Sequence, residues 1–216
     1  KAILYDDETM GSQFHEEPVP EQLRPQVEIY REKILEALAE ADDSFMEKYL
    51  AGEAVSLEEI QALIRRETIS ARLVPVLCGS AFKNKGIQPL LDAVVDYLPS
   101  PLDVPPIRGL HPDTGLEELR TPLNGAPLSA LAFKIMSDPY VGQLTFLRIY
   151  SGSLAAGASV YNSNKGRRER IGRLVRMHAN KREEIKEAGA GDIVAAVGLK
   201  ETMTGHTLCA EDHPLV

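Results

Sequence analysis

Residues 73–98 read LVPVLCGSAFKNKGIQPLLDAVVDYL and decide the fold of the first half of the chain. The apolar run Leu73–Leu77 predicts a strand, and the octapeptide Gly79–Gly86 predicts a tight loop. The apolar residues from Ile87 to Leu98 recur at spacings of three and four and predict a helix. Such a loop exposes main-chain N–H groups beside a helix N-terminus. It is therefore either a binding site for a planar ligand with a carbonyl group or an ordinary connection.

The longer stretch Val74–Gly109, VPVLCGSAFKNKGIQPLLDAVVDYLPSPLDVPPIRG, closely resembles bacterial elongation factor G, the translocation GTPase of the ribosome. The resemblance extends over essentially all 216 residues. In that family the Gly-Ser-Ala motif contacts the guanine base through its main chain. The resemblance implies that Ser80 and Ala81 contact guanine while Gly79 and Phe82 hold the loop. We interpret the nearby loop lysines, Lys83 and Lys85, as solvated.

Two other nucleotide motifs are absent from the sequence. It contains no G-x-x-x-x-G-K-[ST] phosphate loop, and no Asn-Lys-x-Asp motif precedes the predicted strand. Without them there is no cradle for the phosphates and no hydroxyl for magnesium. The resemblance implies GTP or GDP with magnesium in the full-length parent. We expect this chain to be an internal piece of that parent, with no cofactor, no metal site and no catalytic residue of its own.

Composition and charge limit the kinds of partner and compartment that the chain can have. The net charge is −8, and residues 1–70 carry 17 acidic and 7 basic side chains, whereas the other 146 residues carry 15 and 17. This asymmetry predicts different partners for the two halves. No apolar run approaches the roughly 20 residues that span a bilayer, so no membrane partner is expected. The two cysteines, Cys78 and Cys209, lie far apart, which fits a reducing cytoplasm.

Residues 21–50 predict one long amphipathic helix, and Ser56–Glu59 is a capping box that begins a second helix. The apolar stripe of the first helix consists of Val27, Tyr30, Ile34, Leu38, Ala41, Phe45 and Tyr49. Beside it runs a line of carboxylates, Glu28, Glu32, Glu36, Glu40, Asp43 and Glu47. We reject a catalytic role, because nothing desolvates one of these acids. They form either a solvated face or a docking site. The resemblance implies docking of the ribosomal stalk protein at Glu28, Glu32 and Glu36.

The prolines between Pro99 and Pro106 mark a domain boundary, and beyond the loop at 111–124 the apolar pattern changes to a period of two. The predicted strands are Ser129–Ile135, Gln143–Tyr150, Ser159–Tyr161, Arg168–Met177, Asp192–Val197 and Thr207–Cys209. Glycines punctuate them, as in a small closed barrel. The segments AFKI, RIYSGSL and TGHTL resemble the second domain of translational GTPases. His206 stands where that family usually has Asp.

Basic side chains gather between positions 165 and 182. Guanidinium groups bind phosphate through their planar fork. The resemblance implies contact with ribosomal RNA of the small subunit, and the candidates are Arg168, Arg170, Arg173 and Arg176. The alternative is ordinary solubilising charge on the outside of a barrel.

The sequence therefore predicts an α+β remnant of a GTPase domain followed by an all-β closed barrel. The expected divisions are an insert subdomain (1–70), the last strand, guanine loop and helix of the GTPase domain (71–100), a linker (101–124) and the barrel (125–216). The expected function is part of a ribosomal translocation factor. The alternatives are a free-standing ribosome- or RNA-binding module and a paralogous recycling or protection GTPase. We also expect residues 73–98 to expose apolar surface and to permit non-native self-association.

Overall fold

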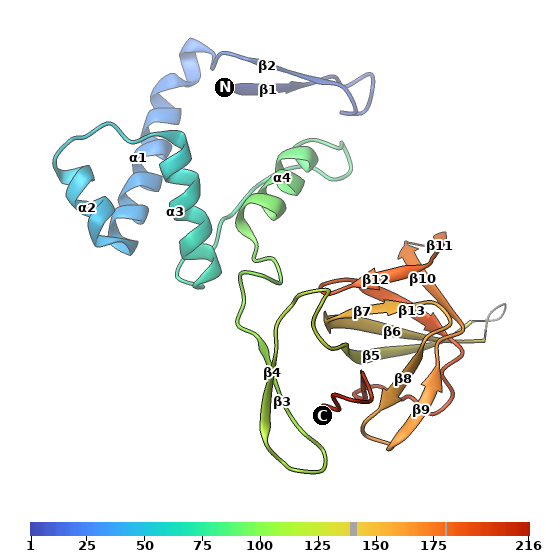
Figure 1. Ribbon diagram of the computed structural model, residues 1–216. Helices are drawn as coiled ribbons and strands as arrows, with labels where there is room; N and C mark the ends of the chain where they lie inside the picture. The colour runs from blue at the N-terminus through green and yellow to red at the C-terminus, as the bar shows by residue number, and fades with distance from the viewer. Residues whose placement is uncertain (139–141, 180) are drawn as a thin grey trace. The chain divides into compact units, whose positions relative to one another are not determined.

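The computed structural model describes residues 1–138, 142–179 and 181–216. These residues form two compact units, Lys1–Pro99 and Ser100–Val216. The first unit contains a short hairpin and helices, and the second is built from strands (Figure 1). The expected fold class, an α+β part followed by an all-β part, is confirmed.

The first unit begins with an antiparallel hairpin, in which Ala2 pairs with Glu17 and Tyr5 with Phe14. The polar stretch after Tyr5 thus contains a second strand. The elements of this unit are β1 (Ala2–Tyr5), β2 (Phe14–Glu17), η1 (Glu21–Leu23), α1 (Arg24–Ala41), α2 (Asp43–Leu50), α3 (Leu57–Ile69) and α4 (Ile87–Tyr97).

The prediction of one helix over residues 21–50 is wrong at Asp42. Asp42 is extended, with φ −143° and ψ 116°, and separates α1 from α2. Its carboxylate accepts a hydrogen bond of 2.7 Å from the Phe45 N–H, so Asp42 is the N-cap of α2. Arg66 of α3 pairs with the same carboxylate. The break allows α2 to fold back so that Phe45 enters the core.

The core of the first unit gathers where α1, α2 and α3 meet, around Leu38, Ala39, Phe45, Ile60 and Leu63. The predicted capping box begins α3, because Ser56 accepts from the Glu59 N–H and the Glu59 carboxylate accepts from the Ser56 N–H. Only the C-terminal half of the α1 stripe is buried. Leu38 is 1% exposed, whereas Ile34, one turn earlier, is 50% exposed.

The predicted strand Leu73–Leu77 does not form. Among the described residues this segment pairs with no strand, and Val76 is 90% exposed. A strand needs a hydrogen-bonded neighbour, and within the described residues the pairing nearest to this segment is the single bridge between Ser80 and Lys85. The apolar side of α4 is exposed as well, as the sequence predicts, with Leu91 60% and Val95 77% exposed.

The second unit is dominated by an eight-stranded antiparallel sheet with the order β11-β10-β13-β6-β5-β14-β8-β9. Within the described ranges no pairing joins β9 to β11, so the expected closed barrel is instead an open sheet in its hydrogen bonding. The strands of this unit are β3 (Ile107–Leu110), β4 (Glu117–Arg120), β5 (Ser129–Asp138), β6 (Gly142–Ser151), β7 (Ser153–Ala155), β8 (Ser159–Asn162), β9 (Arg167–Arg170), β10 (Arg173–His178), β11 (Lys181–Ile185), β12 (Glu187–Gly189), β13 (Ile193–Val197) and β14 (Thr207–Cys209).

Two local features differ from the predicted strands. Residues 101–124, expected as a linker, contain the hairpin β3–β4 (Figure 1). The predicted strand Arg168–Met177 is two strands, because the chain turns at Gly172. A Cβ there would lie 2.9 Å from the Val197 carbonyl oxygen, to which the Gly172 N–H donates at 2.8 Å. This turn separates the arginines of β9 from those of β10.

The inner side chains of the sheet form one continuous core, and Leu147, Ile149 and Leu174 are fully buried within it. Along β6, Leu147 and Ile149 alternate with partly exposed residues, which is the period of two that the sequence predicts. In β10 the buried Leu174 is followed by Val175, which is buried in a separate small cluster with Leu144 and Ala195.

Candidate functional site

The predicted guanine loop is a small closed turn before α4. The Ser80 N–H donates to the Lys85 oxygen at 2.9 Å, and the Lys85 N–H donates back to the Ser80 oxygen at 3.0 Å. Gly79 is required by this geometry, since a Cβ there would lie 2.6 Å from the Lys85 oxygen. Gly86 has φ +79° and is the N-cap of α4. Both glycines bring the two arms of the loop together.

The loop leaves main-chain donors at its tip. Within the described residues the N–H groups of Ala81, Phe82 and Lys83 make no hydrogen bond, whereas that of Ser80 is already used. Of the predicted contacting pair, Ala81 is therefore the residue whose N–H is available to a carbonyl acceptor. Phe82, expected to hold the loop, is 88% exposed, so its ring adds little packing.

A second segment supports the loop, and the sequence did not indicate it. The turn between β1 and β2 lies against residues 83–85: a Cβ on Gly11 would lie 2.5 Å from the Lys83 oxygen. The Lys85 ammonium pairs with the Asp7 carboxylate at 2.5 Å. This hydrogen bond and the charge of Lys85 lower the pKa of Asp7. Lys85, interpreted from the sequence as solvated, is in fact an anchor of the loop.

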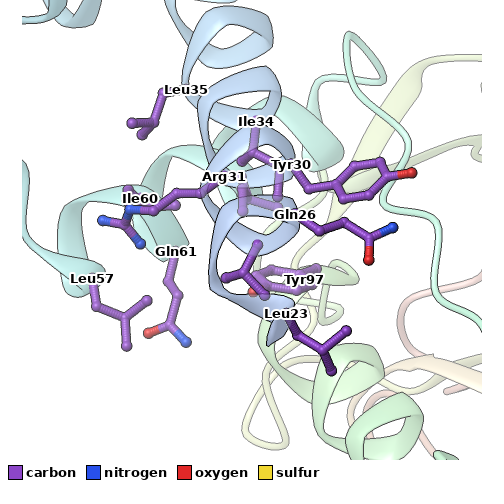
Figure 2. Close-up of a pocket in the computed structure, with 12 residues that line it drawn as sticks. Leu23, Gln26, Tyr30, Arg31, Ile34, Leu35, Leu57, Ile60, Gln61 and Tyr97 are labelled. Carbon is purple, nitrogen blue, oxygen red and sulfur yellow. The ribbon is translucent and has the colours of Figure 1, made fainter. Parts of the chain in front are cut away.

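An apolar groove of about 560 Å³ lies along α1, between α1 and α3, and reaches Tyr97 of α4 (Figure 2). Tyr30 and Ile34, both at least half exposed, line it. They also line an adjoining cavity of about 470 Å³ formed with residues 73–77. The exposed half of the α1 stripe therefore forms a continuous apolar surface with the unpaired segment.

The predicted docking carboxylates lie on the exposed side of α1. Glu28, Glu32 and Glu36 are all exposed. Glu32 accepts a hydrogen bond of 2.5 Å from the Tyr49 hydroxyl of α2, which raises the pKa of Tyr49 to about 12. Glu28 and Glu36 have no hydrogen bond or ion pair within the described residues. These two remain available to a basic partner, whereas Glu32 also ties α2 to α1.

The four candidate arginines are exposed but not equivalent. On β9, Arg168 pairs with the Glu211 carboxylate at 2.5 Å, and Arg170 donates from Nε to the Gly157 oxygen at 3.2 Å. On β10, Arg173 and Arg176 form no such contact among the described residues. The structure therefore separates a pair on β9 that is held by neighbouring groups from a pair on β10 that makes no hydrogen bond or ion pair within the described residues, although Glu183 of β11 stands opposite Arg176.

Glu169 lies between the β9 arginines, and its carboxylate has a structural role. Its Oε2 accepts from the N–H groups of Lys200 and Glu201 at 2.8 and 2.9 Å. Its Oε1 accepts from the Thr202 hydroxyl at 2.5 Å and the Asn162 amide at 3.1 Å. Burial opposes ionisation, but these hydrogen bonds together lower the pKa of Glu169. It thus fastens the 200–202 segment to β9.

His206 occupies the turn that the family usually builds with Asp. Its Nδ1 accepts the Met203 N–H at 3.1 Å and lies 3.3 Å from the Asn162 amide nitrogen. An imidazole nitrogen that accepts carries no proton, so the ring is protonated on Nε2 in this arrangement. The turn therefore keeps its side-chain acceptor without a carboxylate, and Gly205 supplies the φ of +92°.

Comparison with known proteins agrees with this geometry. Residues 127–211 match the family model of elongation factor G domain 2. A protein from Thermus thermophilus of known crystal structure is similar over 94% of this chain, with 29% sequence identity and a TM-score of 0.71. The chain spans 28% of the length of that protein.

The second unit therefore contains a β-domain of the translation-factor class. More particularly, residues 127–211 match the second domain of elongation factor G, and the resemblance read from the sequence is confirmed for that stretch. Within the described residues no helix is both long and apolar enough to cross a membrane. The same residues hold no group of three or more His, Cys, Asp or Glu side chains arranged for a metal ion.

Proposed function

We propose that this chain serves as part of a ribosomal translocation factor that couples GTP hydrolysis to movement of tRNA and mRNA. The observation that carries the proposal is the match of residues 127–211 to elongation factor G domain 2. In this proposal the second unit docks on ribosomal RNA of the small subunit. The first unit supplies a guanine-contacting loop and a docking surface for the stalk protein.

The arginines of β10 are the best candidates for RNA contact. Arg173 and Arg176 are exposed and form no ion pair among the described residues, whereas Arg168 is paired with Glu211. Phosphate contacts by arginine weaken as salt is raised, because binding releases counterions. Contact of this kind follows backbone phosphate and is independent of base sequence.

Co-sedimentation with small ribosomal subunits at two salt concentrations tests this proposal. Arg173→Gln together with Arg176→Gln should weaken binding and reduce the salt slope by about 1 for each phosphate that is no longer neutralised. Arg168→Gln is the matched control and should have the smaller effect. Binding that neither variant changes would contradict RNA docking through this surface.

The guanine contact is proposed for the Ala81 N–H, because this donor is free at the loop tip and small side chains precede it. In a full-length factor, GTP or GDP with magnesium would bind with phosphate-binding segments that this sequence lacks. The chain alone should therefore bind GDP weakly.

In an NMR titration the resonance of the Ala81 amide should shift with GDP and not with ADP. An identical response to both would refute a guanine contact, and tight GDP binding by calorimetry would overturn the account of the missing motifs.

Stalk docking is proposed for α1, because the free carboxylates Glu28 and Glu36 stand on the same helix as the apolar groove (Figure 2). A basic, partly apolar partner matches that combination, and electrostatic steering would make its binding sensitive to salt. Titration with ribosomal stalk protein at low salt should shift NMR signals from residues 21–50, and Glu28→Gln with Glu36→Gln should weaken the effect. If no signal in that range moves, the proposal fails.

A further inference from the structure

The segment Lys200–Met203, between β13 and the turn before β14, is held by side chains rather than by a sheet. Within the described residues it pairs with no strand. Glu169 accepts hydrogen bonds from residues 200, 201 and 202, and Nδ1 of His206 accepts the Met203 N–H at 3.1 Å. The first acceptor is a carboxylate, which accepts on both oxygens when ionised, and the second is an imidazole nitrogen, which accepts only when it carries no proton. The attachment of this segment therefore depends on two protonation states.

The side chain of Asn162 links these two acceptors. Asn162 is fully buried, and its Oδ1 accepts the Lys165 N–H at 3.2 Å, which fixes the orientation of the amide. Its Nδ2 lies 3.1 Å from Oε1 of Glu169 and 3.3 Å from Nδ1 of His206. Nδ1 thus faces an amide N–H as well as the Met203 N–H, and this arrangement leaves no place for a proton on Nδ1 itself.

A proton on Nδ1 of His206 would set a third N–H group against these two donors. Glu169 cannot accept it without losing a bond, because its roughly four acceptor positions already receive four hydrogen bonds. The ring must then turn away from Met203 or displace a donor from Glu169, and either movement releases part of the segment. The end of the turn stays in place, since Gly205 N–H donates to the Ala132 oxygen at 2.7 Å and Ala132 N–H donates to the His206 oxygen at 2.9 Å.

The surroundings of His206 contain charges of both signs. The charged residues on the elements that adjoin it are Glu169 and the three arginines of β9, Lys200 and Glu201 of the segment, Lys165 after β8 and Lys134 of β5. Glu169 attracts a protonated ring, but the Asn162 amide lies within hydrogen-bond distance of both groups. Within the described residues the ring of His206 forms no ion pair, unlike those of His15 and His178. No carboxylate is therefore in place to receive the proton of a charged ring.

We propose that the segment Lys200–Met203 is a pH-sensitive latch, closed while His206 is neutral and opened at Met203 when the ring takes up a proton. Imidazole groups ordinarily do so between about pH 5 and pH 8, whereas carboxylates do so near about pH 4. Burial opposes ionisation of Glu169, but its hydrogen bonds together lower its pKa. As pH falls, the Met203 end should therefore open first and the Lys200 end only in stronger acid. An Asp at position 206, which the related turn usually has, would remain an acceptor through the imidazole range.

The test follows both ends of the latch in the unaltered chain by ¹H–¹⁵N NMR between about pH 8 and about pH 4. The ¹⁵N shifts of the His206 ring should show an unprotonated Nδ1 at the alkaline end. The Met203 amide proton should shift upfield, as its hydrogen bond is lost, with the midpoint of the ring's own titration. The Lys200 and Glu201 amides should move only at lower pH. A Met203 amide that does not follow the ring, or a proton on Nδ1 at the alkaline end, overturns the proposal.

Variants at position 206 separate the latch from general acid effects. His206→Asn offers an acceptor oxygen near the place of Nδ1 but does not titrate, so the Met203 transition should disappear. His206→Asp should move the transition to lower pH by about two units, the difference between an ordinary imidazole and an ordinary carboxylate. His178→Asn is the matched control, because His178 is exposed and its ring contacts Glu183 instead, and it should leave the transition unchanged. A Met203 transition that persists at the same midpoint in His206→Asn would refute the latch.

Discussion

Replacing Glu169 by Gln tests whether one half-buried carboxylate holds the 200–202 segment to β9. The carboxylate accepts four hydrogen bonds, and the replacement turns one acceptor oxygen into a donor that faces two main-chain N–H groups. Hydrogen bonds to a charged group each contribute about 1.5–3 kcal/mol. Lys200 and Glu201 are exposed at least in part, so water compensates part of the loss. We expect a net cost of about 2 kcal/mol, which for a unit of this size lowers Tm by about 8 °C.

The pH dependence of this cost provides the decisive measurement. The pKa of Glu169 is lower in the folded chain than its ordinary value of 4.5, so its stabilisation is complete above that value and is lost as pH falls through the folded pKa. In urea unfolding followed at the second unit, Glu169→Gln should therefore cost about 2 kcal/mol at pH 7 and progressively less below pH ~4.5. Glu184→Gln, on the exposed side of β11, is the control. A cost that is unchanged at acid pH, or no larger than that of the control, would refute the reasoning.

Three further predictions concern the first unit. Asp7→Asn should speed amide exchange of residues 80–86 by several-fold, because it removes the charge that anchors Lys85, whereas the helices should exchange as before. Gly79→Ala should displace the guanine loop, since its Cβ would meet the Lys85 oxygen, and large NMR shifts confined to this loop would be the signature. Leu38→Ala should cost about 2–5 kcal/mol in denaturant unfolding, because it opens a cavity in the core, and a cost under about 1 kcal/mol would contradict that packing.

Local patterns in the sequence were reliable where the structure depends on neighbours along the chain. The capping box at Ser56 and Glu59 was predicted correctly, because both hydrogen bonds close within four residues. The strands β5, β6, β8, β13 and β14 were also recognised from their alternation, with ends displaced by at most three residues. The Gly-Ser-Ala loop before α4 was found for the same reason.

The errors arose where contacts with residues distant in sequence determine the local structure. The break at Asp42 depends on Arg66, 24 residues away, as well as on the local cap. Residues 73–77 have the composition of a strand but remain unpaired among the described residues, because a strand is defined by its neighbour and not by its own side chains. Nothing in the local sequence of Lys85 indicates its ion pair with Asp7, which lies on the turn between β1 and β2.

The sequence by itself determined helices α3 and α4, most strands of the large sheet, the likeness to elongation factor G and the position of the Gly-Ser-Ala loop. These are properties of short stretches whose side chains and glycines act locally. Only the tertiary structure showed which candidate groups make no hydrogen bond or ion pair within the described residues: the N–H of Ala81 rather than that of Ser80, and Arg173 and Arg176 rather than Arg168. Hydrogen bonds and ion pairs between distant segments occupy some of the candidate groups and leave others without a partner. A local sequence pattern does not show which groups are occupied.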